Sequence, residues 1–276
     1  MRKRIKIKKI YFPKNVLIKY LITPLLFAGV IYTLGFFIIF LFSPHIPFLK
    51  GKEYIFIFIF FIISLKSWGR KRWKQKNIWR SLGFLDFGDN ILSPNSRKEL
   101  AKSFLIIFSW SFLLIVGGYI RLTSFSNYNF LFDILFTAVF VGIAEELLFR
   151  VWLFEEFSLY LNKTNAIILQ ALVFSLVHAY NFEESLLTNI LIKIGLFLLG
   201  IYLNLLRVNH YQNIFPSIYF HGGIVGFIFL AKSLFEIQKD YPYLIFGTQY
   251  DKFINPVSGL IGICTLLSLN FYQIQI

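Results

Sequence analysis

Long apolar stretches alternate with shorter polar ones along the chain. A helix needs about 20 apolar residues to cross the hydrocarbon of a bilayer, and in lipid the backbone must satisfy its own hydrogen bonds. The stretches therefore predict an all-α fold, a polytopic, multi-pass transmembrane bundle of about eight helices. The predicted spans are residues 18–42, 54–66, 100–120, 131–153, 165–181, 186–206, 216–232 and 253–273.

The second predicted span is short, and two interpretations of it stay open. Either it starts further back, through Pro47 and Phe48, or it is only partly embedded. The first span is longer than the apolar core of a signal peptide, so we expect it to stay uncleaved.

Composition and charge agree with a membrane protein. The chain is 57% apolar and only 15% charged, a balance that ordinary soluble domains do not have. Its formal net charge of +14 would by itself suit a nucleic-acid-binding protein. The basic residues lie beside the apolar spans, however, where they act as topology signals. We therefore expect membrane lipid, and no nucleic acid, as a partner.

Two basic clusters predict the orientation of the chain. One fills the first nineteen residues and the other fills the loop 66–102, so we expect both termini and this loop to be cytoplasmic. The loop also carries Trp68, Trp73 and Trp79. It is either an amphipathic segment on anionic headgroups or a solvated loop with interfacial anchors. The loop 180–186 has acids but no cations, which fits the outer side.

Two adjacent carboxylates inside a predicted span are the first candidates for chemistry. A charge at mid-membrane costs about 2.5–3.5 kcal/mol, so such residues need partners or a function. Glu146 and Arg150 have the spacing and order of a helical ion pair, for which a packing bridge near the cytoplasmic surface is an equal alternative. Glu145 points about a hundred degrees away and is free to meet other helices. Gly142 and Ala138 would let those helices come close.

Two histidines in later spans are the next candidates. His178 follows Phe174 by one helical turn, so the two rings are expected to pack together, and His221 begins a later span. Either histidine alone is more typical of a buried structural residue. A helix over about 131–160, rising about 1.5 Å per residue, would bring Glu145 and His178 to a similar depth near mid-membrane.

Two chemistries fit these residues, and their spacing does not decide between them. In one, Glu145 takes a proton from water, His178 positions that water, and His221 donates to the developing oxyanion. In the other, a divalent metal such as zinc activates the water and is held by the acids and histidines, with Glu145, Glu146, His178 and His221 as candidates. The His-Glu-x-x-His helix common in zinc proteases is absent from the sequence.

The motifs resemble those of a known family. Glu-Glu-x-x-x-Arg at 145–150, Phe-x-x-x-His at 174–178 and a histidine in a later span are similar to the CPBP family of intramembrane proteases, also called the Abi family. That family comprises CAAX prenyl endopeptidases and bacteriocin-processing enzymes. The resemblance covers roughly residues 100–270. The run Asn255-Pro-Val-Ser-Gly-Leu is similar to cyanobacterial members.

The resemblance implies two parts and a role for each candidate residue. Residues 1–99 would form N-terminal spans with a basic, Trp-rich cytoplasmic loop, and residues 100–276 the protease core. Within an eight-helix endopeptidase, Glu145 and His178 would activate water, Glu146 and Arg150 would support the site, and His221 would help to stabilise the oxyanion. The implied substrate is a hydrophobic peptide or a CAAX-like C-terminal protein tail, cut from the cytoplasmic side.

The third motif departs from the family pattern. An Asn or Asp normally follows its histidine by four residues, but this chain has Val225, which can neither donate nor accept a hydrogen bond. Losing such a group costs on the order of 10²–10³ in rate unless another group replaces it. Asn181, Asn204 and Asn213 are the candidate replacements. Alternatively, the departure indicates a family member that no longer cleaves peptides.

Three functions therefore remain in view. The first is an intramembrane endopeptidase, and the second is a non-catalytic membrane scaffold or regulator that uses the same polar cluster. The third is a transporter or channel, suggested by Lys193 and Asp133 in or near apolar spans, although no inverted repeat is visible. In each case we expect an integral protein of a plasma or inner membrane, or of a thylakoid if the source is cyanobacterial.

Overall fold

The structure is a computed structural model that describes residues 14–42, 53–84, 90–123, 129–178, 185–250 and 253–275. Several predicted features lie outside these residues. They are the basic segment before residue 14, the region of Pro47 and Phe48, Asn181, and the loop acids Glu183 and Glu184; the side chain of Asp133 is likewise not described. The chain divides into two compact units, Met1–Trp68 and Gly69–Ile276, and each is described by itself.

The first unit consists of helix α1 (Lys14–Phe42) and most of helix α2 (Glu53–Arg72). The two helices approach closely at Gly35, where an added Cβ would lie 2.3 Å from the side chain of Ile57. Both helices are longer than predicted. The last turn of α2 contains three basic residues, which favour the negative end of a helix dipole.

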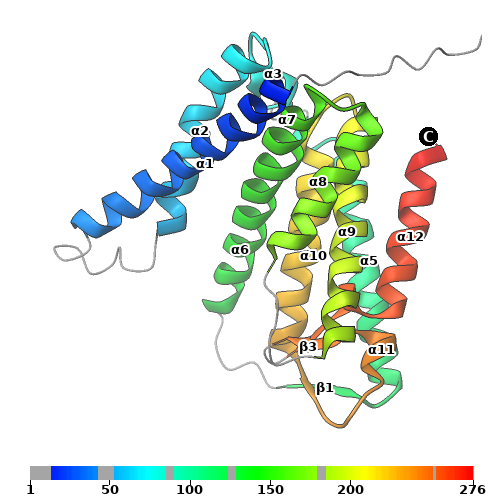
Figure 1. Cartoon of the computed structure of the whole chain (residues 1–276). Coiled ribbons are helices and arrows are strands. Elements are labelled where there is room, and N and C mark those ends of the chain that lie inside the picture. The colour runs from blue at the N-terminus through cyan, green and yellow to red at the C-terminus, as the bar shows by residue number, and fades with distance from the viewer. Residues whose placement is uncertain are drawn as a thin grey trace, which may run out of the picture. The chain divides into compact units, whose positions relative to one another are not determined.

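The second unit is a helical bundle. Figure 1 shows its main helices side by side, with α10 packed against α5, α6 and α9. These helices are α5 (Pro94–Val116), α6 (Asn129–Glu145), α8 (Lys163–Val177), α9 (Leu186–Asn209), α10 (Phe215–Leu234) and α12 (Leu260–Gln275). The all-α prediction is confirmed.

Helix α6 continues without a break into two further helical segments. A π-helix, η2 (Glu146–Leu153), follows it directly and leads into the short helix α7 (Phe154–Ser158). The continuous run agrees with the predicted helix over about 131–160 and extends beyond the predicted span 131–153. The π-helix itself is a local feature that the apolar pattern did not predict.

Four described helices are long and apolar enough to cross a membrane. They are Thr23–Phe42, Pro94–Val116, Leu186–Asn209 and Phe215–Leu234, while α8 and α12 are apolar but shorter. Polar caps fix several starts: the side chains of Ser93, Asn162 and Ser185 accept backbone N–H groups in the first turns of α5, α8 and α9.

The last predicted span was wrong at its start. Residues Phe253–Asn255 form strand β4 and Pro256–Ser258 a 3₁₀ turn, so α12 begins only at Leu260. Pro256 has no N–H to donate, and the side chain of Asn255 accepts the N–H of Val257, which favours a turn over a continuous helix.

Short strands close the end of the bundle where α5 and α10 terminate. Strand β1 (Ile120–Leu122) pairs antiparallel with β2 (Phe235–Ile237), and β3 (Thr248–Tyr250) pairs antiparallel with β4. A short helix, α11 (Tyr243–Phe246), precedes β3. The first ribbon therefore joins the end of α5 to the end of α10.

Most of the basic, Trp-rich loop belongs to the second unit, and part of it is packed there. In the short helix α3 (Ile78–Ser81) and just beyond it, Ile78 and Leu82 are buried. Upstream, the indole of Trp73 donates to Glu156 Oε1 at 2.7 Å, and Arg72 Nε donates to Glu156 Oε2 at 2.6 Å. These contacts favour anchoring of the loop over a freely solvated segment.

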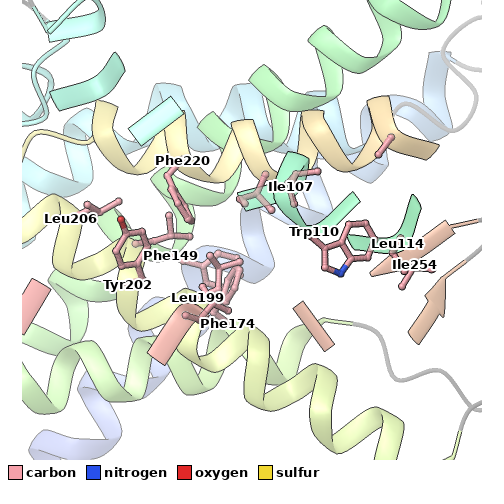
Figure 2. Close-up of a cluster of buried hydrophobic side chains, with 14 of the residues drawn as sticks. Ile107, Trp110, Leu114, Phe149, Phe174, Leu199, Tyr202, Leu206, Phe220 and Ile254 are labelled. Atoms are coloured by element: carbon pink, nitrogen blue, oxygen red, sulfur yellow. The ribbon is translucent and has the colours of Figure 1, made fainter. Parts of the chain in front are cut away.

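Apolar side chains fill the space between the helices and extend to the polar residues of the candidate site. Figure 2 shows this cluster, to which α5, η2, α8, α9, α10 and β4 contribute. Phe149 and Phe174 belong to it, with their ring centroids 5.0 Å apart and nearly perpendicular. The aromatic rings of this core therefore give the charged residues of the candidate site a packed apolar surface to lie against.

Candidate active site

The site is built where α6 and α10 cross at close range. An added Cβ on Gly222 would lie 2.6 Å from the carbonyl oxygen of Ala138, and one on Gly142 would lie 3.1 Å from Gly222 Cα. Small residues therefore permit a backbone approach that larger ones would prevent. The contact brings Glu145, one turn beyond Gly142, opposite His221.

Glu145 meets both histidines across helix boundaries. Its Oε2 atom lies 3.8 Å from His178 Nε2 and 3.8 Å from His221 Nε2. The same oxygen is buried and has no hydrogen-bond partner within the described protein. A separation beyond direct hydrogen-bond range between polar groups is the kind of gap that a water molecule bridges.

The ring tautomers follow from the partners of the other two nitrogens. His178 Nδ1 donates to the carbonyl of Phe174 at 2.6 Å, because a carbonyl can only accept. His221 Nδ1 is 2.8 Å from Glu146 Oε1 and donates to that carboxylate. A neutral imidazole at either position therefore turns an Nε2 lone pair toward Glu145.

Exposure divides the site into an open and a closed part. The side chains of His178 and Glu145 are 31% and 29% exposed, whereas those of Glu146 and Arg150 are fully buried. His221 lies between the two parts and is nearly buried. Solvent or a substrate can therefore reach Glu145 and His178 from one side, while the remaining groups support them from behind.

The closed part contains the predicted ion pair. Arg150 Nη1 lies 3.3 Å from Glu146 Oε1, and the guanidinium carbon lies 4.1 Å from the centre of the Phe174 ring. The same ring packs edge-on against His178, with centroids 4.5 Å apart, so this predicted contact is confirmed. Phe174 therefore touches both the supporting cation and a histidine of the open part.

The π-helix that carries Glu146 and Arg150 is held by a residue that sequence reasoning missed. A guanidinium N–H of Arg207, on α9, donates to the carbonyl oxygen of Arg150, and its Nη2 donates to Glu155 Oε1 at 2.6 Å. Arg207 is 1% exposed. π-Helical turns often mark functional sites, and here a buried cation supplies a donor to one. The feature of the sequence that could have pointed to Arg207 is its position as a cation at the end of an apolar span.

The candidate replacements for the missing third-motif amide have other partners. Asn204 donates to Gln170 Oε1 at 2.9 Å, and Asn213 donates to Asn90 Oδ1 at 2.7 Å. Val225 lies one helical turn beyond His221 on α10. The structure thus brings together all five predicted site residues, and it ties these two asparagines to partners of their own.

The donor set was tested for a metal site. One carboxylate oxygen and two imidazole nitrogens are ligands that zinc accepts. Across the described ranges, however, no group of three or more His, Cys, Asp or Glu side chains is arranged to hold a metal ion. Glu146 and His221 Nδ1 are also committed to each other. As arranged, these donors do not fit a metal ion, and a bound divalent ion stays a prediction.

Comparison with known proteins matches part of the chain to a family model. Residues 127–227 match the family model described as type II CAAX prenyl endopeptidase Rce1-like. The matched segment runs from the start of α6 into α10 and contains all five site residues, so the predicted resemblance to CAAX proteases is confirmed over this segment. No curated protein and no solved structure matches the chain.

Proposed function

We propose that this protein, an integral membrane protein with an Rce1-like segment, is an intramembrane endopeptidase that hydrolyses a peptide bond near the C-terminus of a hydrophobic, CAAX-like substrate. One observation carries the proposal: the Nε2 atoms of His178 and His221 lie at equal distances from the same unpaired oxygen of Glu145. While both imidazoles are neutral, three acceptors face one another, and a water molecule between them supplies two hydrogens.

In the proposed reaction, Glu145 is the general base. The attacking water gives a proton to Glu145 as its oxygen bonds to the scissile carbonyl carbon, and His178 Nε2 accepts the other hydrogen to orient the attack. The tetrahedral intermediate then collapses with cleavage of the C–N bond. The proton held by Glu145 passes to the leaving amine, so atoms and charges balance.

His221 is assigned to the oxyanion. It can donate from Nε2 when that nitrogen carries a proton, and its Nδ1–H bond to the buried carboxylate of Glu146 holds the ring in place. Arg150 holds Glu146 in turn, so the cation behind the site fixes the orientation of the donor in front. Such a preorganised donor supports the developing negative charge without requiring the polar oxygen or amide that Val225 lacks.

The substrate class follows from the family match and the setting. The matched model describes CAAX prenyl endopeptidases, whose substrates are prenylated protein tails. A prenylated or otherwise apolar tail would reach the half-exposed Glu145 and His178 through lipid. We assign the bundle to a plasma or inner membrane, or to a thylakoid, with both termini cytoplasmic.

The test is cleavage of defined C-terminal peptides by the purified protein in lipid nanodiscs. Farnesylated, geranylgeranylated and unmodified peptides are compared by mass spectrometry for the wild type, Glu145→Gln and His178→Ala. We expect both variants to lose about 10²–10⁴ in rate. Glu236→Gln, at an exposed carboxylate on β2, is the matched control and keeps the wild-type rate.

Two readings of the same preparation complete the test. Cleavage that persists equally in all four proteins would come from a contaminant and would refute the proposal. The metal content of the active preparation tests the predicted divalent ion separately: stoichiometric zinc that disappears in Glu145→Gln would replace the protein-only chemistry with a metal-assisted one.

A non-catalytic scaffold is the second candidate, and two observations favour it. Val225 stands where the family motif has a polar residue, and the Trp73–Glu156 contact anchors the basic loop to the helical body. This function predicts that Glu145→Gln leaves cellular function intact, while deletion within residues 66–80 abolishes it. The opposite pattern supports the peptidase.

A further inference from the structure

Lys193 is a cation in the second turn of α9, inside a helix otherwise apolar enough to span a membrane. Its ammonium donates to the carbonyl oxygen of Ser175 at 3.1 Å and to that of His178. Both acceptors belong to the end of α8. The lysine therefore points at the neighbouring helix terminus that carries a site histidine.

The end of α8 has a particular need for such a donor. The helix ends at Val177, and His178 leaves the helical conformation with φ −69° and ψ 141°. Carbonyls in a last helical turn have no intrahelical N–H partner, and inside a bilayer each unsatisfied one costs several kcal/mol. The partial negative charge at a helix C-terminus also attracts a cation.

Hydrogen bonds between α8 and α9 are donated from both helices. Ser175 Oγ donates to the carbonyl oxygen of Lys193 at 2.7 Å, while Lys193 Nζ donates to the carbonyl oxygen of Ser175. This reciprocal pair fixes α8 and α9 in register at the level of His178. The histidine ring then folds back on its own helix through its bond to Phe174.

The surroundings of Lys193 argue against a role in a transport pathway. It lies beside a groove of about 320 Å³ between α8 and α9, which is lined mainly by apolar residues such as Leu172, Leu176, Ile190 and Phe197. A lysine on such a surface commonly extends toward water. Here the ammonium turns to two backbone carbonyls, so its charge serves the helix end.

We propose that Lys193 is a positioning residue for His178: by binding the carbonyls of Ser175 and His178 it fixes the turn that aims His178 Nε2 at Glu145. The inference rests on the proposed peptidase function for its kinetic consequence. Its geometric part concerns only the placement of the histidine and can be tested without turnover.

The test compares Lys193→Met, Lys193→Arg and Lys193→Gln with Lys163→Met, which removes a cation from the start of α8, the end remote from His178. Two quantities are measured in nanodiscs: the rate at which diethyl pyrocarbonate modifies His178, followed by mass spectrometry, and kcat and KM for a cleaved peptide. Lys193→Gln keeps a neutral side-chain NH2 that can donate, and it guards against a methionine variant that does not fold.

In Lys193→Met we expect His178 to be modified severalfold faster and kcat to fall about 10- to 100-fold, because small misplacements of a reacting group are costly. KM should change little. Lys193→Arg should recover most of both quantities, Lys193→Gln should be intermediate, and Lys163→Met should match the wild type.

Three outcomes are decisive. Unchanged modification and kcat in Lys193→Met would overturn the inference while leaving the peptidase proposal intact. A variant that only melts earlier, with wild-type kcat and modification rate, would reduce Lys193 to a structural role and also overturn it. If the wild type cleaves no peptide, the proposed function fails, and the modification rates alone still decide whether Lys193 positions His178.

Discussion

The two faces of the helical run from α6 into η2 differ sharply, although adjacent glutamates mark them. The face of Glu145 is partly exposed, and its Oε2 atom lies 3.8 Å from two imidazole nitrogens with no hydrogen-bond partner among the described residues. The face of Glu146 is closed, and its carboxylate is held by Arg150 and by His221. Two glutamates that are adjacent in the sequence thus have different environments.

The difference separates two tasks that one carboxylate could not perform. A buried charge is tolerated only while its partners remain, so Glu146 is fixed in place by its surroundings. A base must be able to accept a proton and release it, which requires an oxygen that no partner holds, and Glu145 Oε2 has no hydrogen-bond partner within the described protein. Changes on the closed face should therefore reduce stability, and changes on the open face should reduce only rate.

The largest loss of stability is expected from Arg150→Met. It would leave the carboxylate of Glu146 buried without its cation, which costs about 3–5 kcal/mol. The melting temperature of the purified protein in nanodiscs measures the effect. The double variant Glu146→Gln with Arg150→Met removes both charges and should recover part of the loss. Equal melting of the single variant and the wild type would contradict a structural role for the pair.

A smaller loss is expected from Arg207→Met. This change removes the donor to the π-helical carbonyl of Arg150 together with the bond to Glu155, at a cost of about 1.5–3 kcal/mol. Chemical denaturation is the measurement. Glu155→Gln, which keeps the buried guanidinium bonded to the carbonyl, should be milder. If Glu155→Gln were as harmful as Arg207→Met, the ion pair and not the carbonyl contact would dominate.

Gly222→Ala should cost about 1–3 kcal/mol, because the added methyl would overlap the carbonyl of Ala138 and force α6 and α10 apart. It should also slow cleavage by moving His221 away from Glu145. The control is Gly29→Ala in α1, where an added Cβ meets nothing within 4 Å. That change should be neutral or stabilising, since alanine favours helix. Equal effects of the two would argue against a close crossing.

The smallest effect on stability is expected from Glu145→Gln, which should stay within about 0.5 kcal/mol of the wild type even as cleavage is lost. The new amide can donate to an imidazole Nε2, and no ion pair in direct contact is broken. Thermal melting and peptide cleavage measured on one sample check this. A large destabilisation would show that Glu145 is structural, and the contrast between the two faces would disappear.

Local relations within the site could be predicted from the sequence. The pairing of Glu146 with Arg150 and the edge-on packing of Phe174 against His178 follow from helical spacing, because the two partners of each pair are four residues apart. The meeting of three helices around Glu145 did not follow from periodicity. It came from the resemblance to a family, since an apolar pattern carries no information on which faces meet.

Other features needed tertiary contacts that a linear pattern does not contain. Arg207 donates to a carbonyl far away in sequence, and nothing near it in the chain indicates that partner. The π-helix changes the local turn without changing the apolar pattern. The strands at Ile120–Leu122 and Phe235–Ile237 lie at the ends of apolar runs, where strand and helix look alike in short windows.

The ribbon of β1 and β2 also has a consequence for biosynthesis. Arg121 and Glu236 are register partners in it although they lie 115 residues apart, so the first strand leaves the ribosome long before its partner exists. At a synthesis rate of 5–20 residues per second, that delay is roughly 6–23 s. During this interval the end of α5 has no ribbon to join. The helices between the two strands can therefore insert one after another before the ribbon closes the bundle.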